Sequence, residues 1–195
     1  MTTQLLTTPS AADASALAAA IGPDSPDYDN ARASFNLAVD QGGGLIRAIL
    51  ADPGAGFTAR AITRNPASDA AMALAAKGVD VVQADLDDEA SLTRAFEDAH
   101  GIFCVTNFWE HFSPEREKAQ ARNLANAVAA ADPAHVIWST LEDVRDYVPL
   151  NDSRMPTLMG GYKVPHFDAK AEANAFFREA GVPVTYLTPR STGTT

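Results

Sequence analysis

The sequence predicts an α/β fold, a Rossmann-like doubly wound parallel sheet. After residue 41, five short apolar segments alternate with helix-forming segments. Strands separated by helices of roughly ten or more residues are joined by right-handed crossovers, which make the strands parallel. No apolar segment of strand character directly precedes the glycines at positions 42–44, so we expect the sheet to lack a normal first strand.

Each element has a local signal. Phe57–Thr63 alternates apolar with small or polar residues, as a strand does, and Gly78 is placed to end a helix in the C′ position. Pro114 suits the first turn of a long Ala-rich helix. The expected strands are Phe57–Thr63, Val79–Ala84, Gly101–Thr106, His135–Thr140 and Gly181–Leu187. The expected helices are Gly44–Ala51, Asn65–Lys77, Asp88–Ala99, Pro114–Ala131 and His166–Ala180.

The chain divides into three parts. Residues 1–41 form an atypical N-terminal segment, partly helical or disordered, with a short helix expected over Ala11–Ile21 and a second over Asp29–Val39. Residues 42–187 form one truncated dinucleotide-binding domain, and residues 188–195 are a polar tail. A chain of 195 residues is long enough for one domain with a sizeable core.

Composition and charge exclude several function classes. The formal net charge of −10 argues against direct nucleic-acid binding, which needs a basic face to replace counterions. No apolar stretch is long enough to cross a membrane, and the start lacks the basic region of a secretory signal. The single cysteine, Cys104, lies in an apolar run and fits a buried position in a reducing, cytoplasmic environment. The four histidines are scattered, which gives no support for a metal site.

Gly42 and Gly43 are the first candidate site residues. With Gly44 they open the expected helix, where a glycine-rich turn brings backbone N–H groups close to a pyrophosphate. The full fingerprint needs a preceding strand and earlier glycines, but Val39 and Asn36 occupy those positions. A flexible linker is therefore the favoured alternative when these glycines are considered alone.

Polar residues follow the next two expected strands. Arg64 comes after the first, where a guanidinium grips a 2′-phosphate and favours NADP over NAD; the alternative is a solvated loop arginine. Asp85, Leu86 and Asp87 come after the second, where a carboxylate and the backbone can border an adenine. The alternative is that Asp87 or Asp88 caps the following helix, and this role is compatible with adenine binding.

Three further segments complete the candidate site. Thr106, Asn107 and Phe108 end one strand and can line a cofactor, the alternative being a loop whose aromatic residues cover the sheet edge. Ser139 ends another strand, near the place where dehydrogenases of this type polarise a substrate carbonyl. Lys170 is the candidate catalytic and cofactor-binding lysine, but His166 stands four residues before it, where a catalytic tyrosine belongs.

Four segments in order closely resemble the NmrA-like family, atypical relatives of the short-chain dehydrogenases. They are Thr63–Pro66, Val105–Phe112, Val136–Leu141 and Val164–Lys170, within a resemblance that covers about residues 42–187. The resemblance implies an NAD(P)-binding Rossmann fold that prefers NADP, with NAD as the alternative, and that usually lacks the tyrosine. It also implies roles in redox sensing or transcriptional control through a protein partner.

The resemblance also implies a role for each matched position. Gly42 would end the glycine loop, Arg64 would hold the 2′-phosphate, and residues 85–87 would border the adenine. Residues 106–108 would lie along the ribose and nicotinamide, with Lys170 near the nicotinamide ribose.

Two departures from the family pattern lead to further expectations. Residues 27–40 stand where the first strand and early glycines belong, and resemble instead the entry to the FAD-binding domain of berberine-bridge-like oxidases, without flavin attachment residues. Family members also continue for on the order of a hundred residues, which suggests a fused and truncated reading frame. We therefore expect NADP to bind weakly, because side chains at positions 36 and 39 would crowd a pyrophosphate.

Three functions follow as hypotheses. The first is an NAD(P)-binding redox sensor or regulator without tyrosine-dependent dehydrogenase activity. The second is an enzyme, an NAD(P)H-dependent oxidoreductase of the quinone or isoflavone reductase type. The third is a fragment that binds no nucleotide and acts through protein contacts.

Overall fold

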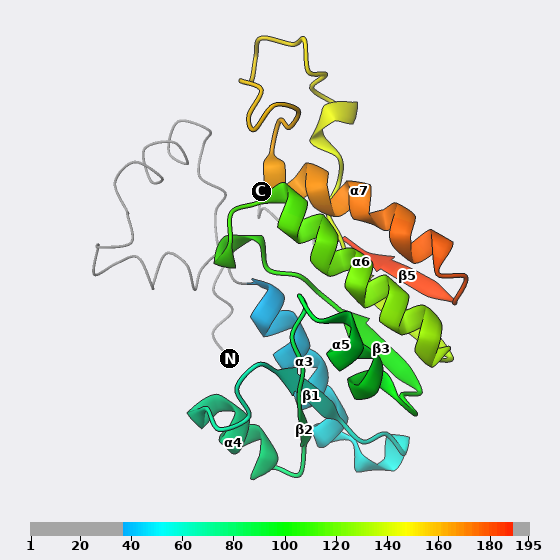
Figure 1. Ribbon diagram of the computed structural model, residues 1–195. Helices are drawn as coiled ribbons and strands as arrows, with labels where there is room; N and C mark the ends of the chain where they lie inside the picture. Colours follow the sequence, from blue (N-terminus) through cyan, green and yellow to red (C-terminus); the bar gives the residue numbers. More distant parts are fainter. Residues whose placement is uncertain (1–36, 189–195) are drawn as a thin grey trace.

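The computed structural model describes residues 37–188, with side chains from residue 43 onward, as three layers of helix, sheet and helix (Figure 1). The helix expected over Ala11–Ile21 lies wholly outside these residues. Most of residues 27–40, which carry the second resemblance, and most of the polar tail also lie outside them. None of the helices within residues 37–188 is long and apolar enough to cross a membrane.

All five strands are parallel but fall into two sheets. In the first sheet, β1 (Arg60–Thr63) pairs with β2 (Asp80–Gln83), and Arg60 lies opposite Asp80. In the second sheet, β4 (His135–Ser139) lies between β3 (Gly101–Cys104) and β5 (Val184–Leu187). Within the described residues no strand joins β1 to β3, and most of the segment where a first strand was considered lies outside them.

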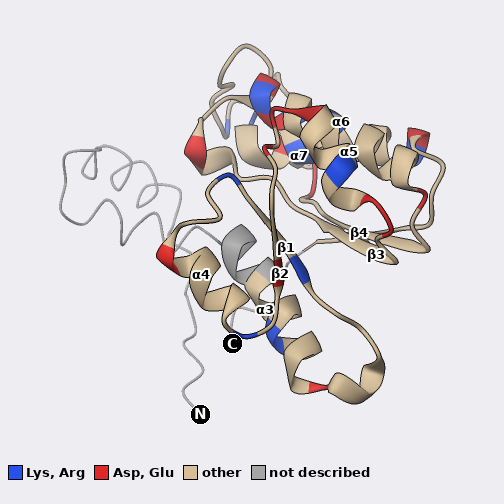
Figure 2. Ribbon diagram, turned by 60° about the horizontal axis from the view of Figure 1, so that its bottom comes forward, with Lys and Arg blue, Asp and Glu red and all other residues tan. Residues whose placement is uncertain are grey.

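The helices lie on opposite faces of the strands. Figure 2 shows α3 (Leu37–Ala51) and α4 (Asp69–Ala75) below the strands, and three helices above them. Those three are α5 (Glu89–Phe96), α6 (Pro114–Ala131) and α7 (Pro165–Glu179). Because parallel crossovers are right-handed, a connecting helix lies on one face of the sheet when the next strand is added on one side and on the opposite face when it is added on the other side. Opposite faces therefore confirm a doubly wound fold whose direction changes between β1 and β3.

The main core lies under the upper helices. Leu92 of α5, Val128 of α6 and Phe177 of α7 are fully buried against β3 and β4. Trp138 of β4 stacks on Phe177 with 4.4 Å between ring centroids. Cys104 is buried in the same cluster, as expected, and burial raises the pKa of its thiol far above the usual range. This thiol is therefore an apolar packing group.

The local signals for helix ends are confirmed. Gly78 follows α4 with φ of +87°, a left-handed conformation that suits glycine. Asp88, one of the two expected caps, accepts a hydrogen bond from the Ser91 N–H at the start of α5. Pro114 begins α6 as expected, and Ser113 supplies the cap.

The expected start of the first helix was wrong. We expected it to begin at Gly44, but α3 runs from Leu37, so the glycines at positions 42–44 lie inside it. A backbone N–H inside a helix bonds to the carbonyl four residues earlier and is not free to bind a phosphate. Helix-forming residues precede the glycines and no proline interrupts them, so the helix continues through positions that each cost roughly 0.5–1 kcal/mol.

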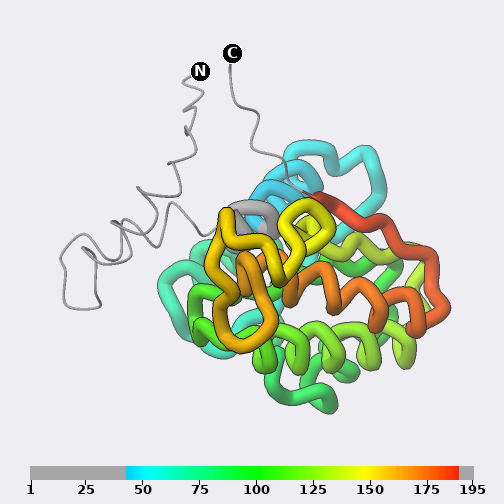
Figure 3. Tube along the Cα trace, turned by 90° about the horizontal axis from the view of Figure 1, so that it is seen from above, coloured from blue at the N-terminus to red at the C-terminus, as the bar shows by residue number. Residues whose placement is uncertain are grey.

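A long loop leaves the carboxyl end of β4 and returns to α7. Figure 3 looks down on this edge, and the loop, residues 140–164, lies across it. Asp168 anchors its base by accepting hydrogen bonds from the N–H groups of Val144, Lys163 and Val164 at 2.9, 2.7 and 3.1 Å. Lys163, also buried, donates from Nζ to two loop carbonyls. The loop thus has a fixed base.

Candidate functional site

The candidate residues follow strands that all point the same way, so most of them gather at one edge. Arg64 follows β1, Asp85 follows β2, Thr106 follows β3, and Ser139 ends β4. In doubly wound sheets, ligands bind beyond this edge, at the point where the direction of winding reverses. Lys170 reaches this edge from α7, whereas Gly42 and Gly43 lie within α3.

Arg64 lies beside a cavity at the ends of β1 and β2. Its guanidinium is largely exposed and donates to Glu110 at 3.0 Å from Nη2. The cavity of about 250 Å³ is lined by Arg64, Gln83, Ala84, Asp85, Asp88, Ser91 and Arg94. Two guanidiniums, of Arg64 and Arg94, and two carboxylates, of Asp85 and Asp88, line this cavity. The Asp85 carboxylate accepts from the Asp87 N–H and the Asp88 carboxylate caps α5, so the guanidiniums are the lining groups that could hold an anion.

The three residues after β2 form a local turn that is hydrogen-bonded to α6. Asp85 forms a local turn in which Oδ1 accepts from the Asp87 N–H at 3.0 Å. Arg116 and Gln120 of α6 donate hydrogen bonds to the Asp87 carboxylate. The hydrogen bond from Arg116 lowers the pKa of Asp87. The Leu86 carbonyl accepts from Asn123 of α6 at 2.8 Å. The backbone of this turn is therefore fixed by α6.

The segment after β3 connects the two ends of the site. Asn107 caps a single turn of 3-10 helix, η2 (Phe108–Glu110), and its side chain also donates to Glu110 at 3.4 Å. Since Glu110 also pairs with Arg64, a polar chain joins the ends of β1 and β3. Phe108 is 5% exposed and packs against aromatic rings, so its side chain covers the edge as the alternative interpretation proposed.

Lys170 forms a buried clamp at the ends of β3 and β4. Its Nζ donates to the Thr106 carbonyl at 3.0 Å and to the Ser139 carbonyl at 3.4 Å. The same atom lies 3.6 Å from Oε1 of Glu117, a fully buried residue of α6. Burial lowers the pKa of Lys170, and the charge of Glu117 opposes this shift. The structure thus unites three predicted residues, Thr106, Ser139 and Lys170, around the ammonium.

Glu117 receives further polar contacts. Thr106 donates from Oγ1 to Oε1 at 2.5 Å, and His111 Nε2 lies 3.3 Å from Oε2. The Ser113 N–H donates to His111 Nδ1, which assigns the ring proton to Nε2, facing the carboxylate. Burial opposes ionisation of Glu117, but His111, Lys170 and Thr106 outweigh it and lower its pKa. Glu117 is therefore the anionic centre of this cluster.

His166 occupies the position four residues before Lys170, but its environment differs from that of a proton donor. Its ring packs against Trp109 at 4.8 Å and Phe108 at 5.8 Å between centroids. Burial lowers its pKa to about 4, with Glu117 opposing and Lys170 adding to the shift. The imidazole is therefore neutral at pH 7 and enclosed by aromatic rings.

Sequence reasoning missed the residues that α6 contributes. Glu117, Gln120 and Asn123 all face the strand ends and bind groups there. The signal that could have found them is their spacing of three residues, which puts polar side chains on one face of an otherwise Ala-rich helix. Polar residues on the buried face of a helix need partners, which the strand ends supply.

The clamp can be tested by a double-mutant cycle on Lys170→Met and Glu117→Gln. Each single change should lower the free energy of unfolding by roughly 3–5 kcal/mol, because it leaves a buried charge without its partner. The double variant should lose about 1–3 kcal/mol less than the sum. Urea unfolding measures all four proteins, with Arg122→Met and Glu179→Gln as an exposed control pair that should couple by less than about 1 kcal/mol. Strict additivity at the buried pair would contradict the clamp.

The burial of His166 predicts a pH dependence of stability. Its folded-state pKa of about 4 lies below the ordinary value of 6.5, so below pH 6.5 the unfolded chain binds a proton that the folded chain does not. The free energy of unfolding should therefore fall between pH 6.5 and 4, by up to ~1.4 kcal/mol per pH unit from this group. Urea unfolding across this range should give a shallower slope for His166→Gln, whereas the exposed control His135→Gln should keep the original slope. An unchanged slope for His166→Gln would be the contrary result.

Comparison with known proteins agrees with this geometry. The model of the NmrA-like family matches residues 35–192. An NmrA-like family domain-containing oxidoreductase of Aspergillus flavus is 36% identical over 105 residues, which are 51% of this chain and 31% of that protein. The chain thus spans about a third of that relative's length.

Two solved structures are similar over most of this chain. The NADPH-dependent quinone oxidoreductase QOR2 of Escherichia coli, complexed with NADPH, has a TM-score of 0.54 and 28% identity, covering 76% of this chain and 45% of that one. The negative transcriptional regulator NmrA, in complex with NADP, has a TM-score of 0.55 and 25% identity, covering 74% and 40%. Since the family model matches well over half of the chain, this protein belongs to the NmrA-like family.

Proposed function

We propose that this chain binds NADP(H) weakly, through the adenosine 2′-phosphate end, and acts as a dinucleotide sensor or regulator without dehydrogenase activity. The observation that carries this proposal is the cavity between the ends of β1 and β2, where Arg64, Arg94 and the turn at Asp85 meet. The two similar structures described as complexes with NADPH and NADP support the choice of ligand.

The residues fit one end of the dinucleotide better than the other. Arg64 would hold the 2′-phosphate, and the fixed backbone of residues 85–87 would border the adenine. The pyrophosphate has no comparable partner among the described residues, because the glycines at positions 42–44 are within α3. Binding energy would therefore come mainly from the adenosine end, which is why we propose weak binding.

The contacts of Lys170 and His166, at the expected nicotinamide end of the site, support a dinucleotide-binding protein rather than a dehydrogenase. Lys170 Nζ is already engaged by two backbone carbonyls and lies near the Glu117 carboxylate. His166 is neutral and enclosed by aromatic rings. A bound nicotinamide cofactor would supply hydride transfer. Of the described residues considered at that end, Lys170 holds strand ends together and His166 packs among aromatic rings, so neither is poised to donate a proton.

An NAD(P)H-dependent oxidoreductase is the second candidate. The similarity to the quinone oxidoreductase QOR2 favours it, because that protein is described as NADPH-dependent. Hydride transfer to a quinone requires that the nicotinamide be positioned beside the quinone, and this positioning does not itself depend on a tyrosine. Turnover of NADPH by a quinone would separate this candidate from a binder without activity.

The proposal is tested by titrating the chain with 2′,5′-ADP, 5′-ADP and NADPH. We expect 2′,5′-ADP to bind about as well as NADPH and at least ~10-fold better than 5′-ADP, since a charge-assisted phosphate contact contributes roughly 1.5–3 kcal/mol. Arg64→Ala should abolish this preference, and Glu110→Gln should strengthen 2′,5′-ADP binding by removing the competing carboxylate. Calorimetry with Arg122→Ala as a remote control makes the measurement. Micromolar or tighter NADPH binding would refute the weak-binding proposal, and no binding by any of the three would refute the function.

A further inference from the structure

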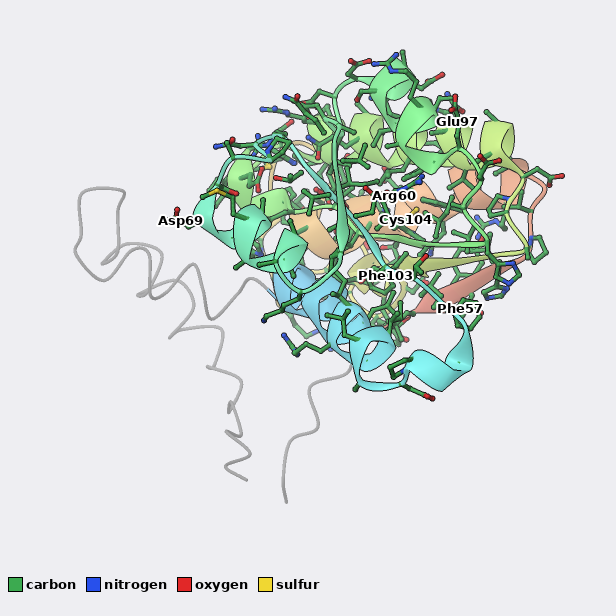
Figure 4. All side chains as sticks on the ribbon, turned by 90° about the horizontal axis from the view of Figure 1, so that it is seen from below. Phe57, Arg60, Asp69, Glu97, Phe103 and Cys104 are labelled. Atoms are coloured by element: carbon green, nitrogen blue, oxygen red, sulfur yellow. The ribbon has the colours of Figure 1, made fainter. Side chains whose placement is uncertain are left out.

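The outer edge of β5 is an open sheet edge in the described part of the chain. On the inner side of this strand, the carbonyls of Pro183 and Leu187 accept hydrogen bonds from β4 and the residue that follows it. Backbone groups alternate in direction along a strand, so Val184 and Tyr186 direct their N–H and C=O groups outward. Nothing within residues 37–188 pairs with these groups. Figure 4 shows the sheet from below, with Phe103 labelled on β3 and β5, in faint red, beyond β4 on the opposite side.

The sequence of β5 lacks the features that usually prevent an edge strand from pairing. Natural edge strands are protected by charged side chains, by proline or by a bulge. Val184–Leu187 contains no charged residue and no proline, and its register with β4 is unbroken. The outer strand of the first sheet, β2, begins instead with Asp80, whose exposed carboxylate pairs with Arg60. Of these two outer strands, β5 is therefore the one suited to pair with another chain.

The strand β5 is complementary to itself in one antiparallel register. Two copies that use the same edge are related by a two-fold axis, which makes their pairing antiparallel. When Thr185 lies opposite Thr185 of the second copy, Val184 of each copy lies opposite Tyr186 of the other. Both members of such a pair direct their N–H and C=O groups at each other, so each pair exchanges two hydrogen bonds. The register also places β-branched opposite aromatic and threonine opposite threonine, which are favourable cross-strand pairs.

An unpaired cation lies beside β5 on the side of its amino end. Arg178, in the last turn of α7, shares a helix face with Asn174, whose carbonyl accepts from Tyr186 Oη at 3.4 Å. Burial raises the pKa of Tyr186, and the charge of Arg178 opposes this shift, which agrees with a guanidinium near the phenol. The Arg178 side chain is exposed and forms no ion pair with the residues whose side chains the structure describes.

An acidic cavity lies at the carboxyl end of β5. Its volume is about 390 Å³, and its lining includes Tyr186 and the carboxylates of Glu142, Asp143, Asp146 and Glu172. Arg145 pairs with Asp143 and Glu172. The exposed carboxylate of Asp146 has no such partner among the described side chains. Antiparallel pairing puts the amino end of one β5 beside the carboxyl end of the other, so Arg178 of each copy lies on the side of the acidic cavity of the other.

We propose that this protein forms a two-fold dimer through β5, in which the three-stranded sheets of two copies join into one continuous sheet and Arg178 of each copy pairs with Asp146 of the other. A second copy presents both the complementary strand and the complementary charge at each end. The paired segment is four residues long, so we expect a small interface with a dissociation constant on the order of 10–100 µM. The inference does not depend on nucleotide binding, which is proposed for a cavity in the other sheet.

Sedimentation velocity and amide hydrogen exchange on the unmodified full chain test the dimer. Sedimentation should show a reversible equilibrium between monomer and dimer. The amides of Val184 and Tyr186 should exchange at least ~10-fold more slowly once most of the chain is dimeric, because they are exposed only in the monomer. The amides of Thr185 and Leu187 face β4 and should be equally protected at every concentration.

Two results with the unmodified chain would overturn the proposal. One is a monomer at every concentration up to about 1 mM. The other is protection of Val184 and Tyr186 that does not change with concentration, which would assign the edge to a segment of the same chain.

Tyr186→Pro and Tyr186→Ala form a matched pair that tests the edge itself. Both variants lose the phenol, but only proline removes the outward N–H, and neither removes a hydrogen bond to β4. We expect Tyr186→Pro to dimerise at least ~10-fold more weakly than Tyr186→Ala, with urea unfolding confirming that both variants fold. Equal dimerisation of two folded variants would place the interface elsewhere and contradict the proposal.

A charge exchange tests the pairing of Arg178 with Asp146. Arg178→Asp and Asp146→Arg should each weaken the dimer at least ~5-fold, and the double variant should return to within about 3-fold of the original, because the opposite charges then face each other again. Lys77→Asp makes the same change of net charge on an exposed residue of the other sheet's layer and should leave the dissociation constant unchanged. A double variant as weak as the single ones would refute this pairing.

Discussion

The right-handedness of parallel crossovers is the constraint on which the rest of this molecule depends. Because α4 and the upper helices α5, α6 and α7 lie on opposite faces, winding runs outward in both directions from the space between β1 and β3. Because right-handed crossovers make the strands parallel, their carboxyl ends meet at one edge, and the reversal lies between β1 and β3 at that edge. Every strand-end candidate residue, from Arg64 to Ser139, is brought to that edge by the topology and not by any contact of its own.

The second constraint is electrostatic. Once Glu117 is buried under the strand ends, it needs positive and polar partners, and Lys170, Thr106 and His111 supply them. The lysine that its spacing marked as catalytic thereby becomes part of the support for β3 and β4. The same ammonium thus holds the ends of β3 and β4 in place beside the buried carboxylate.

The sequence predicted the parts of this structure that depend on local or periodic signals. The five strands, the α6 helix, the Asp88 cap and the burial of Cys104 follow from apolar runs, proline and acidic residues near their own elements. Membership of the NmrA-like family was also predicted, because four separated segments carried the resemblance.

Tertiary contacts decided the features that the sequence did not predict. The pairing of Glu117 with Lys170 joins residues 53 positions apart on two helices, and no local pattern specifies it. The start of α3 was wrong because glycines were taken as a loop signal, whereas the residues on both sides favour helix. The hydrogen bonds from Arg116 and Gln120 of α6 to the Asp87 carboxylate were not predicted either, because they also join separate elements.

The central claim is that the adenosine end of a dinucleotide site is kept while the pyrophosphate end is not. Chemical-shift perturbation of the ¹⁵N-labelled chain by NADPH tests it most directly. The account predicts that the largest changes fall on the backbone amides of Arg64, Asp85 and Leu86, and that the amides of residues 42–44 do not move. Equally large changes at residues 42–44, or changes confined to other parts of the chain, would contradict it.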